Sequence, residues 1–315
     1  MPLRPIPYQF SPAAALWTVG TARIDQCTRS DYIVRIDRAV RIDRAVRIDR
    51  AARIDRAVRI DRAVRISHID RGNNIGSEGV DVNFTEFEPL YETILTDFGF
   101  DRAADERVRD VAADLSTPFP LSRLSHWEGA TVAVAGAAPC LDDDADRSLA
   151  READVVVAAS TAADDLLSAG IDVDCMVTDL DKNPETAAKL TREGVPVAAH
   201  AHGDNLDAVR EWLPRFDAAW TLTTTQAAPV GPVRNTGGFT DGDRAAFLAD
   251  HVGAARLTFP GWEFDDPDVG PMKARKLAWA ARLLRVLERR RDEAFTVLDD
   301  RRERVDSELE DLLGD

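Results

Sequence analysis

The sequence predicts a doubly wound α/β fold, in which a mostly parallel sheet is flanked by helices and followed by a long C-terminal helix. Six short apolar runs rich in Val and Ala lie at 131–136, 154–160, 174–180, 195–201, 218–224 and 256–261. These runs are continuous rather than alternating, as is typical of parallel strands that are covered on both faces. Helical stretches separate them, which gives repeated βα units.

The helices are predicted from the stretches that separate the runs. Those inside the sheet region are expected at about 144–152, 162–169, 184–193, 205–213 and 241–252. Two more precede the sheet, at 85–97 and 102–114. The last helix is expected as one element from about 271 to 312, and its apolar stripe would pack on the sheet or on a partner: Leu277, Leu283, Leu284 and Leu287.

The chain divides into four parts on this basis. Residues 1–81 form a repetitive extension, 82–130 an N-terminal helical segment, 131–270 an α/β catalytic domain and 271–315 the C-terminal helix. The extension repeats the hexapeptide VRIDRA from Val34 in near-perfect copies, which indicates duplicated DNA more than a selected fold. We expect it to be disordered, or to follow from a misplaced start codon with Val82 as the true initiator; a hexapeptide solenoid is the weaker alternative.

Charge and cysteine usage exclude several classes of protein. The 315 residues carry a formal charge of −16, with a net of +5 in residues 1–81 and −21 in the remainder, so general nucleic-acid binding is disfavoured. Cys27, Cys140 and Cys175 have unrelated spacings, which argues against a disulfide framework or a cysteine-based zinc site. No apolar run is long enough to cross a bilayer, and no signal peptide is visible. We expect a cytoplasmic protein without membrane partners.

Lysine is rare in this chain. There are four lysines among 40 basic residues, beside 56 acidic ones. Such a charge excess is screened in a salt-saturated cytoplasm, because the Debye length falls to about 3 Å at 1 M salt. We therefore interpret the source as an extreme halophile; a GC-rich genome that favours Arg codons is the alternative. Lys182, Lys273 and Lys276 are consequently more informative than lysines usually are, and the last two are candidates for neutralising a triphosphate.

Polar residues gather where the predicted strands meet their helices. Four such segments stand out, at 136–140, 178–181, 200–205 and 235–244. In a doubly wound sheet the ligand binds beyond the carboxyl ends of the strands, so these segments are expected to converge on one site.

Asp179 and Asp181 are the first candidate ligands of a metal ion. Two residues apart on extended chain, they project to one side with Cα atoms about 6–7 Å apart. Magnesium prefers one or two carboxylates together with waters and substrate phosphates, so the pair fits a metal–nucleotide site, with Lys182 beside it. The alternative is a helix cap followed by a surface acid.

His200 and His202 also alternate along a strand and are followed by Asp204 and Asn205. A third ligand for a transition metal is not evident, so neutral histidines that contact phosphate or a polar ring are favoured, with Asp204 in the metal shell. The alternative is a pair of interfacial histidines with Asp204 as a helix cap.

The segment before the helix at 241–252 combines flexible backbone with charge. Gly238 allows close approach to a ligand, and the helix that begins after Thr240 presents free amides to an anion. Asp241, Asp243 and Arg244 are candidates for aligning substrate or metal, or else serve as ordinary capping residues. Gly136 follows the first strand, but its surroundings fit neither a dinucleotide fingerprint nor a P-loop.

Together these segments resemble the archaeal-type 6-hydroxymethyl-7,8-dihydropterin pyrophosphokinases. The likeness rests on GAAP at 136–139, TDLD at 178–181, HAHGDN at 200–205 and GFTDGDR at 238–244, and it covers about residues 84–290. That family is distantly similar to thiamin pyrophosphokinase, in which paired aspartates and a later acid hold magnesium. The resemblance implies transfer of diphosphate from ATP to the pterin on the route to folate or methanopterin coenzymes. It implies Asp179, Asp181 and Asp204 as Mg²⁺ ligands.

The resemblance also implies roles for other residues, and the chain departs from the family at two places. His200, His202, Asp241 and Arg244 are expected in catalysis, and the expected contacts with ATP are Gly136, Lys182, Asn205, Gly238, Thr240, Asp243, Lys273 and Lys276. Ser160 and Thr161 stand where relatives usually have Asp-Gly, and Cys140 stands where Ser is common.

Two other functions remain open from the sequence. One is a glycosyltransferase-like protein that binds a sugar nucleotide, and the other is a nucleotide-binding module without turnover. Oligomeric state also stays open, although the final helix offers a surface on which a homo-oligomer would pair.

Overall fold

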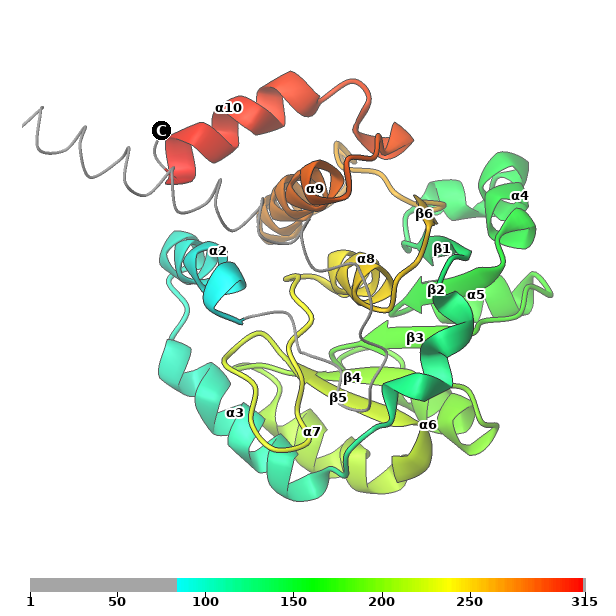
Figure 1. The fold of residues 1–315 in the computed structure, drawn as a ribbon, viewed down its shortest axis with the longest axis vertical. Coiled ribbons are helices and arrows are strands. Elements are labelled where there is room, and N and C mark those ends of the chain that lie inside the picture. Colours follow the sequence, from blue (N-terminus) through cyan, green and yellow to red (C-terminus); the bar gives the residue numbers. More distant parts are fainter. Residues whose placement is uncertain (1–83, 314–315) are drawn as a thin grey trace, which may run out of the picture. The chain divides into compact units, whose positions relative to one another are not determined.

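The computed structural model describes residues 84–313, and its centre is a six-stranded sheet (Figure 1). All strand pairs are parallel, and the strand order is β5-β4-β3-β2-β1-β6. The strands are β1 (Thr131–Ala135), β2 (Val155–Ala159), β3 (Cys175–Thr178), β4 (Val197–Ala201), β5 (Thr221–Thr225) and β6 (Arg256–Thr258). The chain winds outward from β1 to β5 and then returns to place β6 on the other side of β1. The direction of winding therefore reverses between β1 and β6.

Helices cover both faces of this sheet, as predicted. They are α2 (Phe84–Phe98), α3 (Arg102–Leu115), α4 (Asp144–Glu152), α5 (Ala162–Ser168), α6 (Pro184–Arg192), α7 (Leu206–Trp212), α8 (Asp241–His251), α9 (Pro271–Arg291) and α10 (Arg302–Leu313). Short 3₁₀ turns complete the connections: η1 (Leu121–Trp127), η2 (Pro139–Asp142), η3 (Leu213–Arg215), η4 (Ala218–Trp220) and η5 (Thr296–Leu298). None of the described helices is long and apolar enough to cross a membrane.

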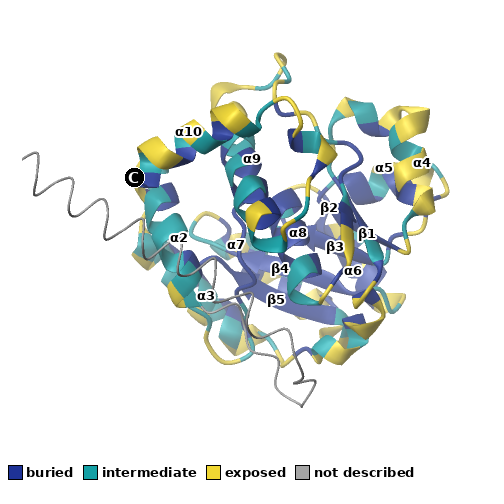
Figure 2. Cartoon of the chain, turned by 45° about the horizontal axis from the view of Figure 1, so that its top comes forward, coloured by how far each residue is buried: buried dark blue, intermediate teal, exposed yellow. Residues whose placement is uncertain are grey.

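The sheet separates two hydrophobic cores, and successive strand residues contribute to them in turn. In β2, Val155 and Val157 pack with α2, α8, α9 and α10, whereas Val156 and Ala158 pack with α3 to α7. Every residue of β2, β3, β4 and β5 is buried, which Figure 2 shows as dark blue strands beneath helices with exposed outer faces. Burial on both faces explains why the strands read as continuous apolar runs.

The N-terminal helices contribute to both cores. Phe87 and Tyr91 of α2 lie in the first core, and Val108 and Ala112 of α3 lie in the second. The loop between α2 and α3 therefore passes from one face of the sheet to the other. It does so at the sheet's β4–β5 end, since α3 contacts β4 and β5.

The C-terminal region differs from the single helix that the sequence predicts at 271–312. α9 ends at Arg291. The next residue, Asp292, has a left-handed backbone at φ 50°, and α10 runs beside α9 as a second helix. Glu288, 1% exposed, fixes the turn, because it accepts hydrogen bonds from the backbone N–H of Phe295 and from Arg302 and Arg285. The two-helix arrangement buries the predicted stripe and also Val305 and Leu309 of α10, which one straight helix would leave in solvent.

Candidate active site

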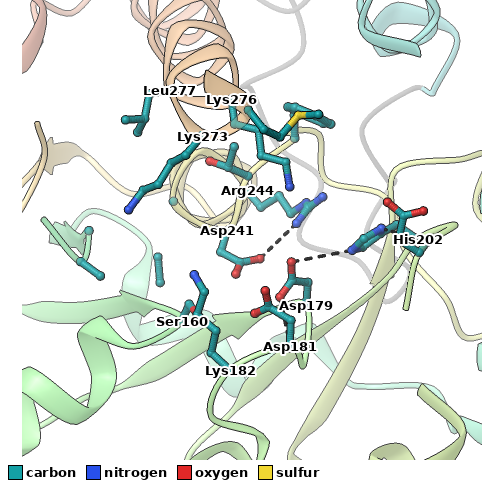
Figure 3. Close-up of a pocket in the computed structure, with 18 of the residues that line it drawn as sticks. Ser160, Asp179, Asp181, Lys182, His202, Asp241, Arg244, Lys273, Lys276 and Leu277 are labelled. Atoms are coloured by element: carbon teal, nitrogen blue, oxygen red, sulfur yellow. Dashed lines mark hydrogen bonds and ion pairs between the residues drawn. The ribbon is translucent and has the colours of Figure 1, made fainter. Parts of the chain in front are cut away.

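One pocket of about 760 Å³ lies beyond the carboxyl ends of the strands (Figure 3). Loops that follow β1, β2, β3, β4 and β5 contribute to its lining, together with the first turns of α8 and α9. Most of the predicted site residues line it: Gly136, Asp179, Asp181, Lys182, His202, Asp204, Thr240, Asp241, Arg244, Lys273 and Lys276.

Asp179 and Asp181 leave β3 on a tight turn that presents both acids to the pocket. The Thr178 hydroxyl accepts a hydrogen bond from the backbone N–H of Leu180 at 3.0 Å, and Asp179 accepts one from the N–H of Asp181 at 3.3 Å. Leu180, between the two acids in sequence, has φ 68° and is 2% exposed, so its side chain points into the hydrophobic core. A buried leucine thus fixes how the two aspartates leave the strand.

Asp241 faces this pair from the first turn of α8, as Figure 3 shows. Its partner is Arg244, one turn later, which donates from Nη1 to Asp241 Oδ1 at 3.0 Å. The turn is held by Asp243, whose carboxylate accepts hydrogen bonds from the backbone N–H of Thr240 and from the Thr240 hydroxyl at 2.6 Å. This capping box directs Asp241 and Arg244 into the pocket.

The three carboxyl groups have strongly different pKa values. Burial opposes ionisation of Asp179, but hydrogen bonds with His202 and Asp181 and the charge of Arg244 hold its pKa well below the usual range. Burial and the neighbouring Asp179 raise the pKa of Asp181 to about 6. Burial and the charge of Asp179 likewise raise the pKa of Asp241 to about 7, although Arg244 opposes this. Asp179 is therefore ionised, whereas Asp181 and Asp241 hold their protons to a higher pH than ordinary carboxyl groups, and a divalent cation would displace those protons.

Three lysines surround the acids. Lys182 follows Asp181 directly, whereas Lys273 and Lys276 reach the pocket from the first turns of α9. Within residues 84–313 none of them forms a salt bridge, so all three ammonium groups are available to a bound anion. An acidic centre with free cations around it is suited to a polyphosphate that carries a divalent cation.

The two histidines lie in different environments. His202 lines the pocket, with Nε2 3.7 Å from Asp179 Oδ2. His200 lies within β4, where its Nδ1 contacts the Thr224 hydroxyl at 3.0 Å, and the residue lines a separate internal cavity of about 10 Å³ together with Arg244. Burial and the charge of Arg244 hold the pKa of His200 well below its usual value. His200 is therefore neutral and lies outside the pocket.

Three other predicted contacts also lie outside the pocket lining. Asn205 donates to the carbonyls of Asp179 and His200 at 2.7 Å each, so its amide holds the β3 and β4 loops together. Asp243 is occupied by the capping box. Gly238 has φ 94°, and a Cβ there would lie 2.6 Å from the Cα of Arg244, so this glycine allows the chain to pass close to α8.

Gly136 lines the pocket, but close backbone packing also accounts for it. A Cβ at Gly136 would lie 2.5 Å from the carbonyl oxygen of Gly261, and a Cβ at Gly261 would lie 2.2 Å from that of Gly136. The loops after β1 and β6 thus cross in backbone contact, which the hydrogen bond from Ala138 N–H to Gly261 O at 3.0 Å reinforces.

Asp105 and Gln226 are pocket residues that the sequence analysis did not identify. Asp105 in α3 is 3% exposed and accepts hydrogen bonds from Tyr91, from Gln226 and from the N–H of Gly203. The side-chain carbonyl of Gln226, Oε1, in turn accepts a hydrogen bond from Arg244 Nη2 at 3.1 Å. A signal was present, since Asp105 interrupts the buried face of an otherwise ordinary amphipathic helix. Two of its partners, Gly203 and Gln226, lie 98 and 121 residues away in sequence, so no local pattern points to them.

Comparisons with known proteins agree with this geometry. The profile of the family described as 6-hydroxymethylpterin diphosphokinase MptE-like matches residues 113–269. Three archaeal proteins named 6-hydroxymethyl-7,8-dihydropterin pyrophosphokinase are similar to the chain. That of Methanothermobacter thermautotrophicus is 37% identical over 219 residues, which cover 64% of this chain and 94% of the relative. That of Pyrococcus furiosus is 36% identical over 188 residues, which cover 58% of this chain and 79% of the relative. That of Methanocaldococcus jannaschii is 28% identical over 232 residues, which cover 65% of this chain and 96% of the relative.

Proposed function

The chain belongs to the family of 6-hydroxymethylpterin diphosphokinases, and from this premise we propose how its pocket carries out the reaction. The protein is a transferase of pterin-related biosynthesis that uses ATP to place a diphosphate on 6-hydroxymethyl-7,8-dihydropterin, with release of AMP. One observation carries the assignment of the site: Asp179, Asp181 and Asp241 face one another in a pocket that Arg244 and three lysines also line, and these lysines form no salt bridge with any residue in the described part of the chain.

The reaction requires charge stabilisation more than a strong base. The hydroxymethyl oxygen forms a bond to the β-phosphorus, the bond from that phosphorus to the oxygen shared with the α-phosphate breaks, and AMP leaves with that oxygen. The hydroxyl proton is released in the same step. Negative charge gathers on the non-bridging oxygens, and Lys182, Lys273, Lys276 and Arg244 are the groups of this chain that would balance it. His202 would orient the hydroxyl or the leaving phosphate.

Magnesium is our proposal for the metal, and the residues present fit it. Asp179 and Asp181 would hold the ion with Asp241 near, and burial together with the neighbouring carboxylates raises the pKa values of Asp181 and Asp241. When bound, Mg²⁺ would neutralise the phosphate oxygens. Among the described residues no three His, Cys, Asp or Glu side chains form a complete metal site. Magnesium commonly takes its remaining ligands from waters and phosphates. Asp204, exposed at the pocket rim, would join through such a ligand.

The pathway and the setting are also proposals. Folate and methanopterin coenzymes both require the pterin diphosphate, and the residues of the pocket favour neither. A salt-rich cytoplasm is the setting that suits the formal charge of −16.

The test is an AMP-release assay with ATP and Mg²⁺, in high salt, with and without the pterin. We expect AMP formation that depends on the pterin, with the pterin diphosphate as the second product. Sugar-nucleotide hydrolysis without pterin turnover would favour a glycosyltransferase-like protein. Tight ATP binding with no product would favour a binding module.

A further inference from the structure

We propose that the two ends of the pocket take different substrates, with the nucleotide at the β1–β2–β6 end and the pterin at the β4–β5 end. The inference rests on the proposed function and adds to it which end of the pocket each substrate occupies. The "nucleotide half" is defined by Ser160, Lys182, Trp262 and Lys273, and the "pterin half" by Phe100, Asp105, His202 and Gln226. The acids after β3, the strand between β2 and β4, lie at the boundary.

Strand order gives the first reason. Winding reverses between β1 and β6, and in doubly wound sheets a nucleotide binds at the crevice where the order reverses. Trp262 lines the pocket there, and its indole N–H donates to the carbonyl of Val134 at 2.8 Å, which fixes the ring. Glu263 and Asp266 lie at the same rim, where the ribose would offer hydroxyl donors.

The distribution of cations gives the second reason. In Figure 3, Lys182 and Lys273 lie with Ser160 on one side of the aspartates and His202 lies on the other. Among the described residues that line the pocket, no lysine belongs to the loops after β4 and β5. If the β- and γ-phosphates of ATP lie at the central acids, the rest of the nucleotide would therefore extend toward β2 and β1.

Ser160 gives the third reason. It directly follows β2 and has a left-handed backbone, at φ 51°, which is unfavourable for a residue with a Cβ. Its backbone is held by hydrogen bonds from its N–H to Val177 and from Asn183 to its carbonyl. Its hydroxyl is buried without a partner among the described residues, in a side chain that is 6% exposed and lines the pocket. A phosphate oxygen of the nucleotide would supply the missing acceptor.

The pterin half has the opposite character. The pterin is flat and uncharged, and its pyrimidine edge presents N–H donors, so it needs acceptors and an apolar wall. Asp105 is a buried carboxylate whose Oδ1 accepts one hydrogen bond among the described residues, from Gly203. Asp204, the residue after Gly203, is an exposed carboxylate that also lines the pocket. Phe100, stacked on Phe98 with ring centroids 5.2 Å apart, and Phe239 provide aromatic surface.

The experiment measures KM separately for ATP and for the pterin with the full chain. Ser160→Gly removes the hydroxyl and suits the left-handed backbone. We expect KM for ATP to rise about tenfold, KM for the pterin to change by less than about twofold, and Tm to stay equal or rise. Phe100→Leu should raise KM for the pterin about fivefold and leave KM for ATP unchanged. Asp292→Gly is the matched control, because it relieves a left-handed residue at the far end of α9; it should change neither KM.

Binding of a non-hydrolysable ATP analogue with Mg²⁺, measured by calorimetry, separates this inference from the proposed function. Ser160→Gly should weaken it about tenfold and Phe100→Leu should not. Reversed effects, or equal effects of both variants on both substrates, would overturn the assignment of the two halves while the enzyme remained a pterin diphosphokinase. A wild-type protein that forms no pterin-dependent AMP would instead refute the proposed function, and the calorimetry would still decide where the nucleotide binds.

Discussion

Asp179 and Asp181 occupy one turn, but their carboxyl groups have different electrostatic surroundings. Asp179 is close to His202 and Arg244, and these groups stabilise its negative charge. Asp181 is an exposed residue whose carboxyl group is only partly shielded from solvent, and this partial burial and the neighbouring Asp179 disfavour its ionisation. Removal of either charge is therefore expected to affect activity in the same way and stability in opposite ways.

We expect Asp179→Asn and Asp181→Asn each to lower kcat by about two orders of magnitude or more, because each removes a charge that the metal–phosphate complex needs. Asp181→Asn should leave Tm unchanged or higher, since it removes repulsion, whereas Asp179→Asn should lower Tm. Steady-state AMP formation and thermal unfolding provide the measurements. Asp207→Asn, an exposed acid in α7, is the control and should change neither. Near-normal kcat in both site variants would contradict the metal assignment.

The raised pKa values of Asp181 and Asp241 predict an unusual pH dependence of stability without metal. A carboxyl group whose folded pKa exceeds its unfolded value stabilises the fold below the unfolded pKa, and this contribution is lost as pH rises through the folded pKa. Between pH 4 and 7, these two groups should therefore lower the free energy of unfolding of the metal-free protein, and the more deeply buried Asp241 should contribute more than exposed Asp181, whose charge solvent screens.

Denaturant unfolding in EDTA at several pH values measures this effect. Asp241→Asn should flatten the fall in stability, and saturating Mg²⁺ should flatten it in the wild type. Equal slopes in wild type and Asp241→Asn would show that Asp241 has an ordinary pKa.

Several side chains near the site have structural roles that the sequence could not reveal. Asn205 and Asp243 carry the residue types of a binding site, yet their polar atoms are already taken by neighbouring backbone and by Thr240. His200 and His202 alternate as predicted, but β4 ends between them, so one is enclosed by the sheet and the other reaches the pocket. Hydrogen bonds between distant segments decide these outcomes, and no local pattern encodes them.

At the scale of elements, the strands and most helices could be predicted because each has a strong apolar pattern. The exception is the break between α9 and α10. Residues 292–296 contain neither glycine nor proline, so the sequence contains no signal that the helix ends there. Asp292 adopts the left-handed conformation that glycine usually occupies at the end of a helix. What ends the helix is a tertiary contact, namely the bonds from Arg302 and Phe295 N–H to Glu288.

Glu288→Ala is expected to destabilise the protein by about 3–5 kcal/mol, because it leaves Arg285 and Arg302 without their buried partner. Glu310→Ala, at an exposed position of α10, is the control and should cost less than about 0.5 kcal/mol. The comparison is made by urea unfolding of both variants. A loss below about 1 kcal/mol for Glu288→Ala would mean that packing of α10 alone holds the hairpin.

For the whole molecule, charge is the dominant property. The arginines of α9 and α10 are largely paired, as in Arg282 with Glu308 and Arg285 with Asp306, so the acidic excess lies mainly elsewhere on the surface. Self-repulsion of that excess is a long-range effect, and added salt should screen it.

Tm is therefore expected to rise by roughly 5 °C or more between 0.1 M and 2 M KCl, equivalent to about 2 kcal/mol for a protein of this size. Differential scanning fluorimetry over a KCl series provides the measurement. Sucrose at matched osmolality is the control, since it leaves charge repulsion in place. A Tm that falls with KCl would refute the interpretation of the acidic composition as an adaptation to salt.

The contact between Gly136 and Gly261 has a consequence for how substrates come and go. Backbone meets backbone there with no side chain to swing aside, so the floor of the pocket near β1 and β6 is rigid. Spent AMP cannot depart through it. We therefore expect AMP to leave past the first turn of α9, where Met272 is half exposed and Lys273 is an exposed residue of the pocket lining.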